Sequence, residues 1–191
     1  MRLICSRHWA LTVALALSLG LAGQSPRAIA GAPDPGRDPV KIAFIDTGNT
    51  GRSVAAEALA DRLVRSRGLR VLVIARAIDV DPFETSPEPA VARLLAARGM
   101  DVRRHRAEGL TADDVRHASL ILTMTAEHRR RVIERFPGAA PRTFTLAAYA
   151  VGKSEDVADA KGLPAAASAE MIRQLDRLLP LALARASDVA P

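Results

Sequence analysis

The sequence predicts a three-layer α/β sandwich built around a four-stranded parallel sheet, and three observations support this. Short apolar runs alternate with segments whose apolar residues recur at helical spacing, which is the order of parallel strands joined by crossover helices. The apolar runs are nearly continuous, as expected for strands covered on both faces. The chain has 191 residues, of which 49% are apolar, with one Trp and one Tyr. This length suits a single domain once any targeting segment is removed.

The first expected unit is a strand, a tight loop, a helix and a second strand. The run Val40–Ile45 is rich in apolar and β-branched residues and is expected as the first strand. A helical pattern over Ser53–Arg67 follows, and Gly68 is expected to end it because glycine readily takes the left-handed conformation that closes helices. Leu69–Ala75 is the second strand. A right-handed crossover is expected to join the two strands.

The later elements are placed by the same signals. Helices are expected at Ala90–Arg98, Thr111–His117, Ala126–Phe136 and Ser168–Arg185, and strands at Leu120–Met124 and Arg142–Leu146. Thr111 suits the cap of its helix, since its hydroxyl can accept a hydrogen bond from a free N–H of the first turn. Ile78–Pro89 and Ala147–Pro164 are expected as loops. Pro180 is expected to kink or shorten the last helix.

The junction between the first strand and the first helix carries the strongest functional signal. Its residues are Asp46, Thr47, Gly48, Asn49, Thr50, Gly51, Arg52 and Ser53. Two glycines and an asparagine allow left-handed backbone positions, so that successive N–H groups point inward at a helix N-terminus and form an anion nest. Arg52 adds a planar fork suited to a tetrahedral oxyanion. The segment from Thr47 to Arg52 is therefore expected to bind phosphate or a phosphate-like group.

Two residues at this junction each have a second interpretation. An ordinary surface arginine at position 52 would need no ligand. The nest and the guanidinium fork are both suited to a tetrahedral anion, however, which favours Arg52 as an anion ligand. Ser53 is suited to capping the helix that begins there.

The spacing of this loop resembles the phosphate-binding loop of the low-molecular-weight protein-tyrosine phosphatases and related arsenate reductases, whose pattern is a Cys, five residues, then Arg and Ser. The resemblance covers about Val40–Leu183 and implies a phosphotyrosine phosphatase I-like sheet with the strand order 2-1-3-4. Asp46 stands where the family has its nucleophilic Cys, and Gly51 stands where a second Cys is frequent. For Ser53, the resemblance adds a hydroxyl donated to the nucleophile. We therefore expect a phosphatase scaffold without cysteine chemistry.

The resemblance also assigns roles to two residues far along the chain. Asp159 lies in a segment similar to the family's general-acid loop, where Ala160 and Lys161 stand in place of a Pro and an aromatic residue. Asp159 is either the general-acid position or an ordinary solvated loop acid. His105 stands where a family His braces the phosphate loop through Asn49, although a His among arginines is also typical of a solvated surface.

Other positions that support the loop in the family differ here. Glu108 and Gly109 stand in place of an Arg-Gln pair, Thr125 in place of an Asp, and Ala75–Ala77 in place of Ser-Ala-Gly. Because several supports differ together with the nucleophile position, the pattern indicates relaxed catalytic constraint.

The first thirty residues have the features of a signal peptide. Arg2 and Arg7 precede the apolar stretch Ala10–Ala22, and Ala28–Ala30 is a small-x-small cleavage site. The stretch is shorter than the ~20 residues that span a bilayer, which favours cleavage over a retained membrane anchor. The expected organisation is a signal peptide at 1–30, a Pro- and Gly-rich linker at 31–39, a phosphatase-like domain at 40–185 and a C-terminal tail at 186–191. The expected location is the periplasm or the medium, with no stable membrane span after cleavage.

Cleavage would change both the charge and the thiol content of the chain. It removes three arginines and leaves 24 basic and 21 acidic residues, a net charge of +3, which is too small to indicate a polyanion partner. It also removes Cys5, the only cysteine, and with it disulfides, thiol redox work and cysteine catalysis. The arginine-rich helix around residues 128–135 has no interleaved aromatic residues, so a solvated helix is favoured over a nucleic-acid patch.

Three functions remain open from the sequence. The first is a degenerate phosphatase that binds a phosphate-like anion or a phosphorylated ligand, with Asp46 seated in the nest and hydrogen-bonded by the loop amides and by Arg52. The second is an active phosphomonoesterase with Asp46 as its nucleophile. The third is an exported interaction scaffold without anion binding, whose protein partner the sequence does not identify. No cofactor or metal is expected for any of them.

Overall fold

The computed structural model describes residues 38–188, and the structural statements below concern these residues. The expected signal peptide and residues 31–37 of the expected linker lie outside them. The strands are β1 (Val40–Asp46), β2 (Val71–Ala77), β3 (Leu120–Thr123) and β4 (Thr143–Thr145). The helices are α1 (Arg52–Arg67), α2 (Pro89–Ala96), α3 (Ala112–His117), α4 (Ala126–Arg135), the 3-10 helix η1 (Pro137–Arg142), α5 (Leu146–Val151) and α6 (Ala165–Asp188).

The four strands form one parallel sheet with the order β2-β1-β3-β4, as expected from the resemblance. β1 and β3 are neighbours in the sheet, and the chain leaves β1 into α1 on one face and leaves β3 into α4 on the other face. Such a point in an open parallel sheet is where ligands usually bind. The fold therefore places the loop from Thr47 to Gly51 at the position expected of a binding site.

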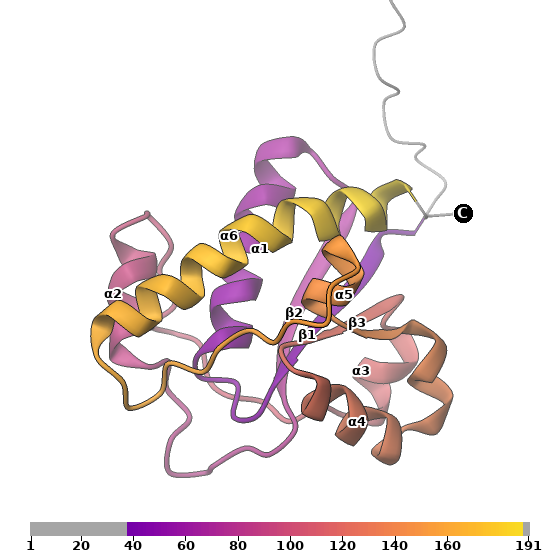
Figure 1. Cartoon of the computed structure of the whole chain (residues 1–191), viewed down its shortest axis with the longest axis horizontal. Coiled ribbons are helices and arrows are strands. Elements are labelled where there is room, and N and C mark those ends of the chain that lie inside the picture. The colour runs from indigo at the N-terminus through magenta and orange to yellow at the C-terminus, as the bar shows by residue number, and fades with distance from the viewer. Residues whose placement is uncertain (1–37, 189–191) are drawn as a thin grey trace, which may run out of the picture. The chain divides into compact units, whose positions relative to one another are not determined.

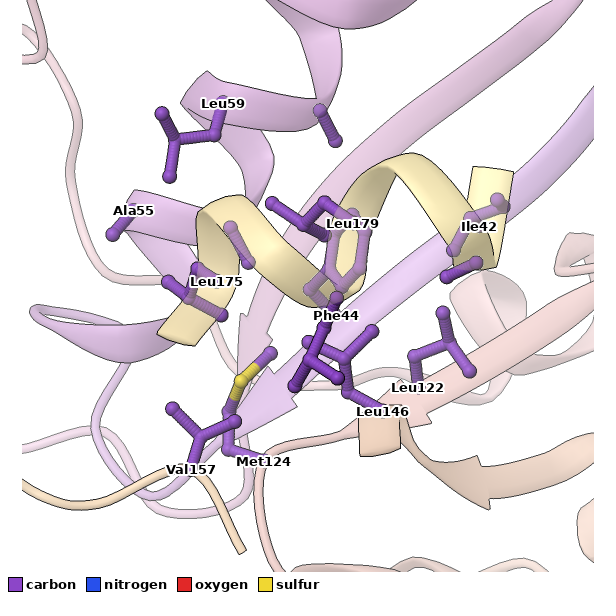
Figure 2. Packing of buried hydrophobic residues seen from close by; sticks show 14 of the residues in the cluster. Ile42, Phe44, Ala55, Leu59, Leu122, Met124, Leu146, Val157, Leu175 and Leu179 are labelled. Atoms are coloured by element: carbon purple, nitrogen blue, oxygen red, sulfur yellow. The ribbon is translucent and has the colours of Figure 1, made fainter. Parts of the chain in front are cut away.

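Two helical layers cover the sheet. On one face a large apolar cluster joins the sheet to α1, α2, α5 and α6, and α6 packs against α1 (Figure 1). Figure 2 shows Phe44 of β1 among Leu146, Leu175 and Leu179. On the other face a smaller cluster joins Ala43 and Ile45 of β1 to residues of α3 and α4. This alternation along β1 confirms a strand that is covered on both faces.

Several details differ from the sequence-based expectations. Strand β2 begins and ends two residues later than expected. Leu146–Val151, placed in the fourth strand and the following loop, is the helix α5, and Thr145 caps it by accepting a hydrogen bond from Ala148 N. Helix α6 passes through Pro180 and runs to Asp188, so Pro180 does not shorten it and the expected tail begins later than 186. Thr111 caps α3 as expected, within a capping box completed by Asp114.

Candidate active site

The loop at the carboxyl end of β1 forms a nest as expected, although neither Gly48 nor Gly51 has a positive φ and the left-handed position belongs to Asn49 alone. Asp46 is the last residue of the strand and Arg52 is the first of α1. Asn49 has a φ of 54° and is the one residue other than glycine with a positive φ among residues 38–188. A left-handed residue between right-handed neighbours turns successive N–H groups toward a common centre. The loop is therefore built to surround an acceptor with backbone donors.

The acceptor in this nest is the side chain of Asp46. Its Oδ1 accepts a hydrogen bond from Asn49 N at 2.6 Å, and its Oδ2 accepts one from Ser53 N at 2.9 Å. The residue is only 3% exposed. Both oxygens of the carboxylate are thus engaged by backbone N–H groups at the N-terminus of α1, where the helix dipole also favours negative charge.

Arg52 does not contact Asp46 as the sequence suggested. Its Nη2 donates to Asp159 Oδ2 at 2.9 Å, and its Nη1 lies 3.5 Å from the carbonyl oxygen of Val157. Arg52 is buried, whereas the side chain of Asp159 is 55% exposed. The structure therefore brings together Arg52 and Asp159, both of which the sequence predicted at the site. Asp159 is the counter-ion of Arg52, on the solvent-exposed side of the loop.

Asn49 holds the loop in place through three contacts. Its Nδ2 donates to Ser53 Oγ at 3.0 Å, and its Oδ1 accepts from Glu108 N at 3.0 Å. Its carbonyl oxygen accepts from His105 Nε2 at 2.9 Å. His105 thus lies where the family's bracing His was expected. Glu108 contacts Asn49 through its backbone N–H, so this contact does not depend on the Glu108 side chain.

Ser53 is not the cap of α1. Gly51 occupies the cap position, and no side-chain hydrogen bond caps the helix. The Ser53 hydroxyl is fully buried and accepts the hydrogen bond from Asn49, while the backbone N–H of Ser53 serves Asp46. Ser53 therefore supports the loop from inside the first turn of the helix.

Sequence reasoning missed two residues at this site. His128 of α4 is 5% exposed, and its Nε2 lies 2.9 Å from Thr47 Oγ1, at hydrogen-bond distance. Burial, and then the nearby Arg52 charge, lowers the pKa of His128, which disfavours the charged ring. The sequence does place His128 on a short helix directly after a buried strand. Its arginine neighbours, however, favoured the prediction of a solvated helix.

Glu88 is the second missed residue, and it lies beside Gly51. A Cβ added to Gly51 would lie 2.6 Å from Glu88 Oε1, and Glu88 N donates to the carbonyl oxygen of Thr50 at 2.9 Å. Burial, and then the charge of Asp159, raises the pKa of the Glu88 carboxyl. No sequence spacing links Glu88 to this loop, because the contact depends on how the segment before α2 returns to the sheet.

The three consecutive arginines of α4 each have a hydrogen-bond or ion-pair partner. Arg130 contacts Glu127 and Glu134, and Arg131 contacts Asp79. Arg129 Nε donates to the carbonyl oxygen of Thr143 at 2.8 Å. Arg76, at one of the altered support positions, pairs with Glu108 and Asp114 across the end of β2.

The arrangement limits the chemistry available to residues 38–188. They contain no cysteine, since the single one is Cys5. Within this range no three His, Cys, Asp or Glu side chains are grouped so as to hold a metal ion, and no helix is both long and apolar enough to cross a membrane. What the site offers is a nest of backbone donors around a carboxylate, next to an arginine that is paired with an acid.

Comparisons with known proteins agree with the family resemblance and with the fold. Residues 41–185 match the family model described as low molecular weight phosphotyrosine protein phosphatase. Over 145 residues, 73% of this chain and 94% of the relative, the sequence is 34% identical to a protein-arginine-phosphatase of Geobacillus stearothermophilus. It is 29% identical to a low molecular weight protein-tyrosine-phosphatase PtpB of Staphylococcus haemolyticus, over 64% of this chain and 83% of the relative. A crystal structure of a YwlE mutant from Bacillus subtilis superposes with a TM-score of 0.73 at 28% identity, covering 76% of this chain and 97% of that one.

Proposed function

Because the chain belongs to the low molecular weight phosphotyrosine protein phosphatase family, we propose that it is an exported pseudophosphatase whose phosphate loop is occupied by its own Asp46. Asp46 takes the place of the nucleophilic cysteine in this proposal. The observation that carries it is the seating of the Asp46 carboxylate on Asn49 N and Ser53 N, two donors that face the centre of the loop.

The charge of Asp46 explains why the loop would bind external phosphate poorly. A carboxylate and a phosphate oxygen about 4 Å apart repel by about 4 kcal/mol at an effective dielectric constant near 20. Arg52 cannot fully offset this, because its guanidinium is already paired with Asp159. The internal carboxylate therefore competes with any phosphorylated ligand for the same donors.

The hydrogen bonds of Asp46 to the loop amides make it a poor nucleophile. A carboxylate that attacks phosphorus needs an oxygen free to approach the phosphoryl group in line. Here each oxygen of Asp46 accepts a short backbone hydrogen bond, and the side chain is buried. The seated conformation is suited to holding the loop closed.

The test is calorimetric titration of sulfate and phosphate into the wild-type chain and the variant Asp46→Ala. We expect tighter anion binding by the variant, because the loop amides are released and the repulsion is removed. Asp176→Ala is a matched control, since it removes an exposed acid of α6 that pairs with Arg98. Equal or weaker anion binding by Asp46→Ala, with an unchanged circular dichroism spectrum, would contradict the proposal.

A second test asks whether the position of Asp46 is that of the family nucleophile. The variant Asp46→Cys should hydrolyse an aryl phosphate or a phosphoarginine peptide faster than the wild type, because a thiolate on the same nest can attack phosphorus. Phosphoarginine is included because two relatives are named protein-arginine-phosphatase. Hydrolysis by the wild type at the rate of the variant would show that Asp46 supports catalysis.

The export part of the proposal is supported by the charged start, the apolar stretch and the Ala28–Ala30 site, in that order. Sequencing the mature N-terminus from a periplasmic fraction tests it. An intact leader on protein recovered from the cytoplasm would count against export.

A further inference from the structure

Thr47 and His128 make a contact at the edge of the phosphate loop that the proposed function does not use. Thr47 comes directly after Asp46 and is exposed, whereas His128 of α4 is 5% exposed. The Nε2 atom of His128 lies 2.9 Å from Thr47 Oγ1, at hydrogen-bond distance, although the two residues are 81 positions apart in the chain. A buried ring therefore holds the side chain of an exposed hydroxyl residue in the loop.

The His128 ring lies among the charged groups of the loop. Burial lowers its pKa most, Arg52 lowers it further, and Asp46 raises it. Outside the loop, Arg131 lowers the pKa and Asp156 raises it. Because the net shift is downward from the ordinary value of about 6.5, the ring is neutral at pH 8 and carries a single hydrogen on one of its two nitrogens.

The surroundings of the ring favour one position for that hydrogen. Nδ1 is buried and makes no hydrogen bond with any group of residues 38–188. Buried N–H groups without an acceptor are rare, because such a donor has lost its water and gained no partner. A hydrogen on Nε2 avoids this cost, since Nε2 then donates to Thr47 Oγ1 and only a lone pair of Nδ1 stays buried.

This form of the ring decides what the Thr47 hydroxyl can do. A hydroxyl has one hydrogen and two lone pairs. When Oγ1 accepts from the ring, its own hydrogen is not used by the ring and is left for another acceptor. Since Thr47 is exposed, a ligand on the solvent-exposed side of the loop can be that acceptor. The same form of the ring cannot take a proton from Thr47, so the pair is not a nucleophile with its base.

We propose that the hydroxyl of Thr47 donates a hydrogen bond to an oxygen of a tetrahedral oxyanion bound in the loop, and that His128 is the positioning residue that keeps the hydroxyl in this role. The sequence assigned Thr47 to the anion loop through its backbone, and this proposal adds its side chain. It rests on the proposed function, because an oxyanion reaches the loop amides only where the Asp46 carboxylate does not occupy them.

The state of the ring is tested on the wild-type chain by nitrogen NMR of the histidine side chains at pH 8. The His128 signals are assigned by their loss in His128→Gln. We expect a hydrogen on Nε2 and none on Nδ1. A hydrogen on Nδ1 would overturn the proposal, because the Thr47 hydroxyl would then donate to the ring. This measurement involves no anion, so its outcome does not depend on the proposed function.

The ligand contact is tested by calorimetric titration of sulfate at pH 8 into the Asp46→Ala chain. Adding Thr47→Val should weaken sulfate binding by about tenfold or more, since it removes a hydrogen bond to a charged group and keeps the side-chain volume. Adding Thr47→Ser should keep most of the affinity, because the hydroxyl remains. Equal sulfate affinity with threonine and with valine at this position would overturn the contact.

The role of His128 is tested by a double-mutant cycle in the same Asp46→Ala chain. His128→Leu should weaken sulfate binding by about threefold where Thr47 is present and have no effect beside Thr47→Val, because the ring acts only through the hydroxyl. His117→Leu is the matched control, since His117 is an exposed histidine of α3 and should leave both affinities unchanged. Equal losses from His128→Leu in the two chains would indicate a merely structural role and would overturn the positioning role.

The proposed function and this inference fail in different ways. Sulfate binding by Asp46→Ala that is no tighter than binding by the wild type contradicts the proposed function. Tighter binding that is insensitive to Thr47→Val contradicts only the inference. Absence of sulfate binding by Asp46→Ala contradicts both, since the hydroxyl would then have no oxyanion to contact.

Discussion

Strand β1 buries two kinds of side chain that are equally hidden from solvent but are held in different ways. Phe44 is 0% exposed and Asp46 is 3% exposed. Phe44 is stabilised by apolar neighbours on α5 and α6, so its contribution depends on volume and shape. Asp46 remains buried only because two N–H groups meet its oxygens. In the middle of β1 a buried side chain must therefore have the right volume, and at the end of β1 it must accept hydrogen bonds.

The largest effect is expected from emptying the apolar middle of the strand. Phe44→Ala should lower the free energy of unfolding by about 3–5 kcal/mol, since it leaves a cavity among fully buried side chains. Urea denaturation followed by circular dichroism measures this, with exposed Leu72→Ala as the control at about 0.5 kcal/mol or less. A loss of less than about 1 kcal/mol for Phe44→Ala would show that the cluster collapses around the missing ring.

The end of the strand is tested by Asp46→Leu beside Asp46→Ala. Leucine fills the space without accepting hydrogen bonds, so the N–H groups of Asn49 and Ser53 lose their partner, at a cost of about 2–4 kcal/mol. Added sulfate should restore stability to the alanine variant, which has room for an anion, and not to the leucine variant. Thermal unfolding across a sulfate series measures both. Equal stability of Asp46→Leu and the wild type would show that the two donors do not depend on this acceptor.

The sequence was a sound guide to β1, the loop and α1 because their signals are local. Asn49 takes the left-handed position of the nest, a conformation that asparagine adopts more readily than most residues, and its N–H and that of Ser53 donate to Asp46. The sequence did not predict α5, because a threonine such as Thr145 is equally typical of the last residue of a strand and of a helix cap. Glu88 and His128 reach the loop only through tertiary packing, which no local pattern encodes.

A smaller effect on the free energy of unfolding, one that depends on pH, is expected at Glu57 of α1. Burial raises the pKa of the Glu57 carboxyl to about 7 against the opposing effect of Arg76, with Asp61 and Glu108 adding to the rise. His105 also faces it at 4.0 Å. A raised pKa in the folded state means that the folded chain binds the extra proton, so stability is greatest below pH 4.5 for this group and falls as the pH rises toward 7.

The variant Glu57→Gln should flatten this dependence by about 1–2 kcal/mol between pH 5 and 8. Urea denaturation of both proteins at several pH values measures it. A wild-type stability that rises over this range, relative to the variant, would contradict the assignment.

The smallest effect is expected at the mouth of the loop. Asp159→Ala should change the free energy of unfolding by less than about 1 kcal/mol, since its carboxylate is half exposed to solvent. Placed on Asp46→Ala, the same substitution should increase sulfate affinity, because Arg52 loses its competing partner. Calorimetry on the single and double variants decides this. An unchanged affinity would mean that Arg52 does not face the anion.

The contact between Gly51 and Glu88 links position 51 to the charges beside the loop. A side chain at position 51 would meet the Glu88 carboxylate, since a Cβ there would lie 2.6 Å from Glu88 Oε1. That carboxylate is the far end of a flexible side chain, so it would rotate away while the backbone kept its place. The residue at position 51 is thus a selector of the Glu88 rotamer, and through that rotamer it sets how near the Glu88 carboxylate lies to Asp159.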